Sequence, residues 1–151
     1  MKKVFVFLFV LCSASLSFGQ QYLSSITLPI GAGGDMVVPG FVEVAAARNR
    51  VYVTTVTCPF NSCPSPISND LIVIDGASDT IVNSIHFGFQ IFDSVYNPVN
   101  DRLYLATFQG GIQVIDPGTN TVVGVISSVP ESSYLAVNTT TNTLYASDFR
   151  A

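Results

Sequence analysis

The chain has 151 residues, of which 48% are hydrophobic and only 11% charged, and its formal net charge is −4. This length and composition predict one compact domain built from many half-buried strands and exclude a disordered segment. Nucleic acids and anionic lipids bind to basic patches, so the acidic balance excludes both as partners.

Residues 1–19 have the pattern of a signal peptide. Lys2-Lys3 precedes an apolar run from Val4 to Leu11, and Ser17-Phe18-Gly19 offers small residues for cleavage after Gly19. We therefore expect export to the periplasm, the extracellular space or the cell surface. The run is too short for a stable membrane anchor. Cleavage would leave four arginines against ten acidic residues, a net charge of −6.

Residues 20–40 are interpreted as an N-terminal strand followed by a glycine-rich loop. Apolar residues alternate within Leu23 to Ile30, which is typical of a strand. The loop from Gly31 to Asp35 lacks the Gly-Lys-Ser/Thr ending of a phosphate-binding loop. A flexible connection is the favoured interpretation.

A repeat begins at residue 41. Leu71-Ile72-Val73-Ile74-Asp75 recurs as Ile112-Gln113-Val114-Ile115-Asp116, and the two aspartates are 41 residues apart. Short turns between the apolar runs predict antiparallel meanders with four strands per repeat, the third repeat being incomplete. The predicted strands are 41–46, 50–55, 71–75 and 80–85, then 93–97, 102–107, 111–116 and 121–126, and finally 134–138 and 143–147.

The turns have recurring residues. We expect left-handed backbone at Asn49, Asp101 and Asn142, each three residues before a tyrosine. After the third strand of each repeat, the carboxylates of Asp75 and Asp116 are expected to accept hydrogen bonds from nearby backbone N–H groups. Both aspartates are therefore interpreted as turn-forming residues.

The first repeat contains an insertion. Its tyrosine, Tyr52, lies 23 residues before Asp75, whereas Tyr104 lies 12 residues before Asp116, so 11 extra residues fall between the second and third strands. They include Cys58 and Cys63, which in an exported chain predict a disulfide. A metal site would need more ligands, and neither a metal nor another cofactor is predicted.

The repeated motifs carry a resemblance to a known family. Tyr52-Val53-Thr54-Thr55, Tyr104-Leu105-Ala106-Thr107 and Tyr145-Ala146-Ser147-Asp148 resemble, together with the two Val-Ile-Asp motifs, the YVTN family of β-propeller repeats over residues 41–148. Thr55 departs from the family pattern, which has Asn there. The resemblance implies an all-β propeller of four-stranded antiparallel blades over 41–88, 93–130 and, incomplete, 134–151, but no particular reaction.

The resemblance implies two and a half to three blades, whereas closed propellers have roughly four to eight. Either the chain is a truncated piece of a longer propeller, or several chains assemble to close the ring. Truncation is favoured, because ending after a second strand leaves an open sheet edge. An oligomer is expected only if the chain is not truncated.

The predicted function is a non-enzymatic binding or cell-surface interaction scaffold for an unknown protein or small-molecule ligand. The alternative is a fragment of a propeller enzyme, of lactonase or lyase type. The only acidic residues that the first strand of each repeat offers for such a catalytic site are Glu43 and Asp93. His86 has no motif partner, so no catalytic residue is predicted. A contact surface is expected near the insertion. The other possibility is that its aromatic residues are buried between blades. The candidate contact residues are Phe60, His86, Phe87, Phe89, Phe92 and Phe108.

Overall fold

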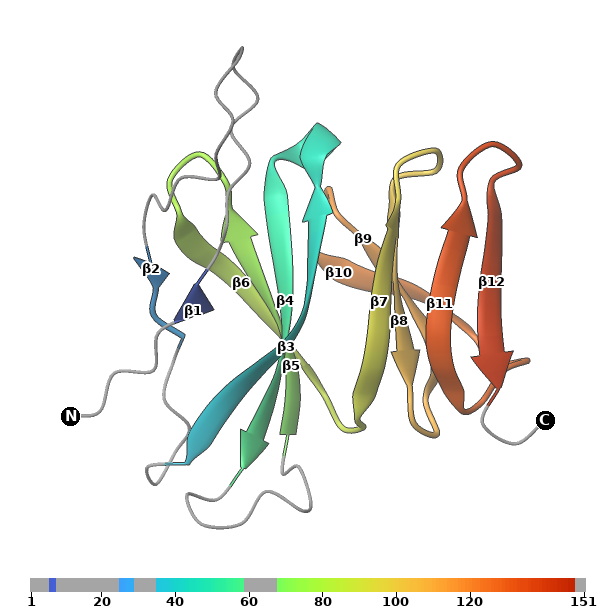
Figure 1. Cartoon of the computed structure of the whole chain (residues 1–151), viewed down its shortest axis with the longest axis horizontal. Coiled ribbons are helices and arrows are strands. Elements are labelled where there is room, and N and C mark those ends of the chain that lie inside the picture. The colour runs from blue at the N-terminus through green and yellow to red at the C-terminus, as the bar shows by residue number, and fades with distance from the viewer. Residues whose placement is uncertain (1–5, 8–24, 29–34, 59–67, 149–151) are drawn as a thin grey trace.

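The computed structural model describes residues 6–7, 25–28, 35–58 and 68–148, and the fold is all-β (Figure 1). Three antiparallel sheets follow one another along the chain. Sheet I contains β3 (Met36–Ala45), β4 (Arg50–Cys58), β5 (Ser68–Asp75) and β6 (Thr80–Phe87). Sheet II contains β7 (Ile91–Asn97), β8 (Arg102–Thr107), β9 (Gly111–Asp116) and β10 (Thr121–Ile126). Sheet III pairs β11 (Ser132–Asn138) with β12 (Thr143–Asp148).

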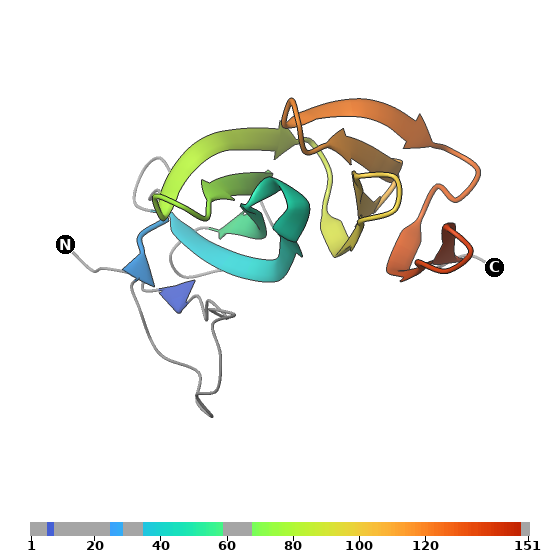
Figure 2. The ribbon, with the colours of Figure 1, turned by 90° about the horizontal axis from the view of Figure 1, so that it is seen from above.

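The three sheets stand in a curved row (Figure 2), and the described residues do not close it into a ring. The first strands β3, β7 and β11 line the concave side, whereas β6 and β10 lie on the convex side. A separate small sheet pairs β1 (Val6–Phe7) with β2 (Ser25–Ile26) at the end of the row beside sheet I (Figure 1). The predicted four-stranded antiparallel meanders are therefore confirmed for sheets I and II.

Strand β3 begins at Met36, so the predicted boundary at residue 40 falls inside it. Pro39 and Gly40 read as breakers in the sequence, but a bulge between Pro39 and Val42 absorbs them. At the bulge, the Phe41 N–H donates to Thr54 Oγ1 over 2.8 Å. A proline is tolerated here because β3 is an edge strand.

Part of the insertion extends the hairpin of β4 and β5. Thr55, Val56 and Thr57 pair with Asp70, Asn69 and Ser68, in register with the rest of the two strands. The second strand was predicted to end at residue 55 and the third to begin at residue 71, and both of these bounds are wrong, because β4 ends at Cys58 and β5 begins at Ser68. These paired residues are mostly polar, so they lack the alternation of apolar and polar residues from which a strand is predicted.

The turn residues adopt the predicted conformations. Asn49, Asp101 and Asn142 have φ of 50°, 53° and 53°, in the left-handed region. Asp75 Oδ1 accepts hydrogen bonds from the backbone N–H groups of Ala77 and Ser78, which lower the pKa of the carboxyl group. The equivalent Asp116 accepts the N–H of Gly118 over 2.7 Å in the same way, and the turn-forming role of both aspartates is confirmed.

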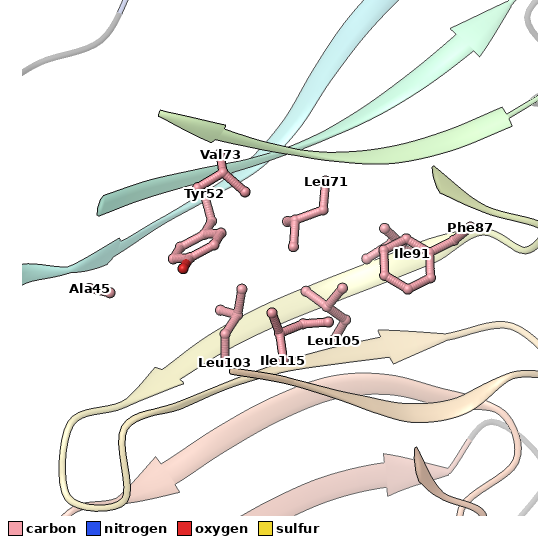
Figure 3. Packing of buried hydrophobic residues seen from close by; sticks show 9 residues of the cluster. All are labelled: Ala45, Tyr52, Leu71, Val73, Phe87, Ile91, Leu103, Leu105 and Ile115. Atoms are coloured by element: carbon pink, nitrogen blue, oxygen red, sulfur yellow. The ribbon is translucent and has the colours of Figure 1, made fainter. Parts of the chain in front are cut away.

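Sheets I and II pack face to face through a shared apolar core (Figure 3). From sheet I, Tyr52, Leu71 and Val73 point toward sheet II. The residues that meet them from sheet II are Leu103, Leu105 and Ile115, all fully buried. A single meander buries neither of its faces by itself, so each sheet depends on its neighbours to cover its apolar faces.

Hydrogen bonds fix the rim of this interface. The Tyr52 hydroxyl donates to Asn120 Oδ1 over 2.9 Å, and Asn83 Nδ2 donates to the Asn120 carbonyl over 3.0 Å. Asn120 has φ of 54° in the turn between β9 and β10. At the neighbouring turns, Arg48 and Asp101 form an ion pair whose Nη2 and Oδ2 atoms are 2.5 Å apart. The recurring tyrosine at position 52 therefore has both a buried ring and a polar partner for its hydroxyl.

Replacing Tyr52 with Phe should lower the free energy of unfolding by about 1 kcal/mol, because Asn120 Oδ1 loses its donor while the ring contacts remain. Tyr145→Phe is the matched control, since this tyrosine of sheet III is 58% exposed. Urea unfolding of both variants tests the difference, and an equal effect of the two substitutions would contradict the interface described above.

Candidate functional site

The β6–β7, β8–β9 and β10–β11 connections lie along one edge of the sheets, here called the loop edge and seen at the bottom of Figure 1, whereas the turns of the β3–β4, β5–β6 and β7–β8 hairpins lie at the opposite edge. The Phe108 N–H donates to the Gln90 carbonyl over 2.8 Å, which joins the β8–β9 turn to the β6–β7 connection. The Gly111 N–H donates to the Pro130 carbonyl over 3.2 Å, which joins the start of β9 to the β10–β11 connection. The loop edge is therefore one continuous rim across sheets I and II.

Four of the predicted contact residues form two aromatic pairs at this edge. The ring centroids of Phe87 and Phe89 are 5.7 Å apart, and those of Phe92 and Phe108 are 6.0 Å apart in an edge-to-face arrangement. Phe87 is only 5% exposed and belongs to the core between sheets I and II, and Phe89 packs against that core. Phe108 is 36% exposed. The exposed ring among these four is thus Phe108, which packs on the half-buried Phe92, and Phe60 lies outside the described residues.

Glycine is required next to the first aromatic pair. A Cβ atom added to Gly110 would lie 2.8 Å from Phe89 Cζ and 2.6 Å from Thr107 Oγ1. The turn that contains Gly110 is held from both sides, since Thr107 Oγ1 donates to the Gly111 carbonyl and Gln113 Nε2 to the Gly110 carbonyl, each over 2.5 Å. The aromatic rings at the loop edge are therefore supported by a tightly bonded turn.

His86 presents its imidazole to solvent. It lies on β6 opposite Asp70 on β5, its Nδ1 is 2.9 Å from Asp70 Oδ1, and 65% of its side chain is exposed. Cys58 is fully buried at the end of β4, while Cys63 lies outside the described residues, so the disulfide between them stays a prediction. Among the described side chains, no group of three or more His, Cys, Asp and Glu residues is arranged to hold a metal ion.

Two carboxylates lie on the first strands of sheets I and II, along the concave side. Glu43 on β3 accepts a hydrogen bond from the backbone N–H of Tyr96 on β7. Asp93 on β7 accepts one from Leu135 on β11, over 2.8 Å to Oδ2. Burial and, to a smaller extent, the charge of Asp93 raise the pKa of Glu43, against the opposing effect of the Tyr96 N–H. Both carboxylates therefore tie one sheet to the next.

Some polar residues near the loop edge were not singled out from the sequence. Asn69 is 4% exposed on β5, and its Oδ1 has no hydrogen-bond partner; the same holds for Ser132 Oγ at the start of β11. Gln113 was visible as the polar residue between Ile112 and Val114, but its hydrogen bond to the β8–β9 turn was not. The contact of Asp70 with His86 needed the strand register.

No protein-family model matches the chain, and no curated protein sequence is significantly similar to it. Within the part of the chain that the structure describes, no helix is long and apolar enough to cross a membrane. The assignment of a function therefore depends on the geometry of the sheets and of the loop edge.

Asp93→Ala should lower the free energy of unfolding by about 1 to 3 kcal/mol, because the Leu135 N–H loses a charged acceptor. Asp93→Asn keeps an acceptor oxygen and should lose less. Chemical denaturation of both variants measures the difference, and equal losses would show that the bond between sheets II and III is not what stabilises them.

Glu43→Gln should raise the thermal midpoint at pH 7 by a few degrees and leave it unchanged near pH 3. The raised pKa of Glu43 means that folding favours its protonated form, so its contribution to stability is present at low pH and is lost as pH rises through the folded pKa. Glutamine does not ionise and removes this dependence. Thermal unfolding at both pH values checks the prediction, which fails if the two proteins have the same midpoint at pH 7.

Proposed function

We propose that this chain is an exported β-propeller repeat protein of the YVTN kind and that it acts as a non-enzymatic binding scaffold through its loop edge. The 41-residue spacing of Asp75 and Asp116 coincides with two successive four-stranded sheets. Both sheets have the same cross-strand register, in which Tyr52 and Tyr104 occupy equivalent positions. Equivalent sheets that pack face to face along a curved row support their assignment as propeller blades.

The pair Phe92–Phe108 is the observation that carries the binding role. Its rings lie on β7 and directly after β8, two strands paired in sheet II, so they are held by rigid elements. Phe108 is 36% exposed and does not belong to the apolar core shared by sheets I and II. Rigid, accessible aromatic side chains bury a large area on binding at a small entropic cost, and they are common at contact surfaces.

The exposed imidazole of His86, one residue before the end of β6, and the carboxylate of its partner Asp70 place polar groups on the same edge. An aromatic centre with neighbouring hydrogen-bonding groups suits a protein segment or a small organic ligand. The proposed disulfide between Cys58 and Cys63 would restrict the conformational freedom of the chain between them.

A second candidate function is a propeller enzyme of lactonase or lyase type. The raised pKa of Glu43, whose carboxyl group interacts with the charge of Asp93 on the neighbouring strand, favours it, because catalytic acids and bases commonly have shifted pKa values. Against this, both carboxylates accept backbone hydrogen bonds between sheets, which explains their position without catalysis. The scaffold is therefore the better-supported function.

Site-specific photo-cross-linking tests the scaffold. The cross-linker p-benzoylphenylalanine placed at Phe108 should give a discrete adduct in the cells that export the protein, because this position lies on the proposed contact surface. The matched control is Val82 on β6, which is 47% exposed on another part of the molecule and should give none. The same adducts at both positions, or none at Phe108, would contradict the assignment.

The enzyme alternative is tested separately by a lactone-hydrolysis assay on the unaltered protein with and without added divalent metal. The scaffold predicts no turnover under either condition. Turnover that Glu43→Gln abolishes would overturn the non-enzymatic assignment.

A further inference from the structure

Strand β10 is the outer edge strand of sheet II, and its exposed side chains are apolar. The strand order β10-β9-β8-β7 gives β10 a partner on one side only. Val122, Val123 and Val125 are 40%, 52% and 52% exposed. The strand, Thr121–Ile126, contains neither a charged residue nor a proline. Unpaired backbone groups beside exposed valines form an edge to which another strand can pair.

The other edge strands of sheets I and II carry residues that hinder such pairing. Strand β3 contains Pro39 and Glu43, and β7 contains Asp93. The outer strand of sheet I, β6, has Ser84 at the position of Val125, since each pairs with the third residue before the turn-forming aspartate. Charged, polar and proline residues protect free edges from pairing. The apolar edge of β10 is therefore not a general consequence of the repeat.

The edge of β10 stays accessible however many sheets the row contains. Sheets I and II pack through their faces, so a further sheet at either end of the row would cover a face and not this outer edge. The edge lies on the convex side, and the curvature of the row turns the outer strands of neighbouring sheets away from it (Figure 2).

The two ends of β10 differ in charge. The turn before β10 begins at the carboxylate of Asp116, whereas the exposed residues Ser127 and Ser128 follow the strand at the loop edge. The chain is acidic overall, with a net charge of −4, so two copies attract only if their acidic ends are kept apart. Antiparallel pairing of two β10 strands places the Asp116 end of each beside the serine end of the other.

We propose that β10 is a docking edge for β10 of a second copy of this chain, paired antiparallel across a twofold axis at Gly124. In this register Val123 of each copy pairs with Val125 of the other, and cross-strand pairs of β-branched residues stabilise a sheet. The contact is isologous, and it joins the two four-stranded sheets into one continuous sheet.

A second copy fits this edge better than a segment of another protein does. The valines are matched by the valines of the copy, whereas the strand offers no charge by which an acidic or basic segment would be selected. The dimer places the two loop edges at opposite ends. Its formation does not depend on the binding role of Phe108.

Sedimentation equilibrium of the full chain, expressed with its own leader, tests the dimer over a range of concentrations. Pairing through one strand is a small contact, so the apparent mass should rise with concentration from that of a monomer toward twice that value. Val123→Lys should remain monomeric, because a lysine on the free edge hinders pairing. The matched control is Val82→Lys, which alters the same bulge position in β6, is 47% exposed and should leave the dimer unchanged.

An unaltered chain that stays monomeric up to its solubility limit would overturn the proposal. So would a dimer that persists in Val123→Lys, or one that both lysine variants lose equally. Circular dichroism shows whether the strands are retained. If Val123→Lys loses them, Val123→Thr/Val125→Thr keeps the β-branched shape without the apolar surface, and the same outcomes decide. Phe108→Ala should dimerise as the unaltered chain does, so this proposal and the binding role of Phe108 fail independently.

Discussion

The packing of a tyrosine-bearing sheet face on the aliphatic face of the next sheet is the interaction on which this structure depends. Tyr52 is buried against sheet II, and its hydroxyl bonds to Asn120 in a turn of that sheet. Asn120 is presented correctly only because its turn has left-handed backbone and begins at Asp116. Burial of the ring therefore links the apolar core, the turn chemistry and the 41-residue spacing of the repeat.

Much of the fold could be predicted from the sequence, because strands and turns depend on residues that are close together in the chain. Strands β8, β9 and β10 have their predicted bounds, and the left-handed residues Asn49 and Asp101 were identified by residue type. The early start of β3 could not be predicted, since a bulge overrides the local signals of Pro39 and Gly40. Contacts between sheets, such as that of Asp93 with Leu135, have no sequence signal because they depend on how separate repeats dock.

In the candidate site, too, local features could be predicted from the sequence and contacts between sheets could not. The sequence predicted six contact residues, of which five lie in the described part of the chain, but it could not separate buried from accessible rings. Phe87 completes the core because sheet II covers the end of β6, whereas the pair Phe92–Phe108 lies beyond that cover. The packing of Ile26 and Leu28 on β4 and β5 was also hidden, because those strands lie far along the chain. The proposed binding surface is thus a consequence of which sheet faces are covered.

The central claim is that the two repeats dock through the Tyr52 face, and nuclear Overhauser effects measure this contact directly. The structure predicts cross-peaks from the Tyr52 ring protons to the methyl groups of Leu103 and to the side-chain amide of Asn120. Cross-peaks from Tyr52 only to its own sheet, with none to residues of sheet II, would contradict the face-to-face arrangement and the functional proposals built on it.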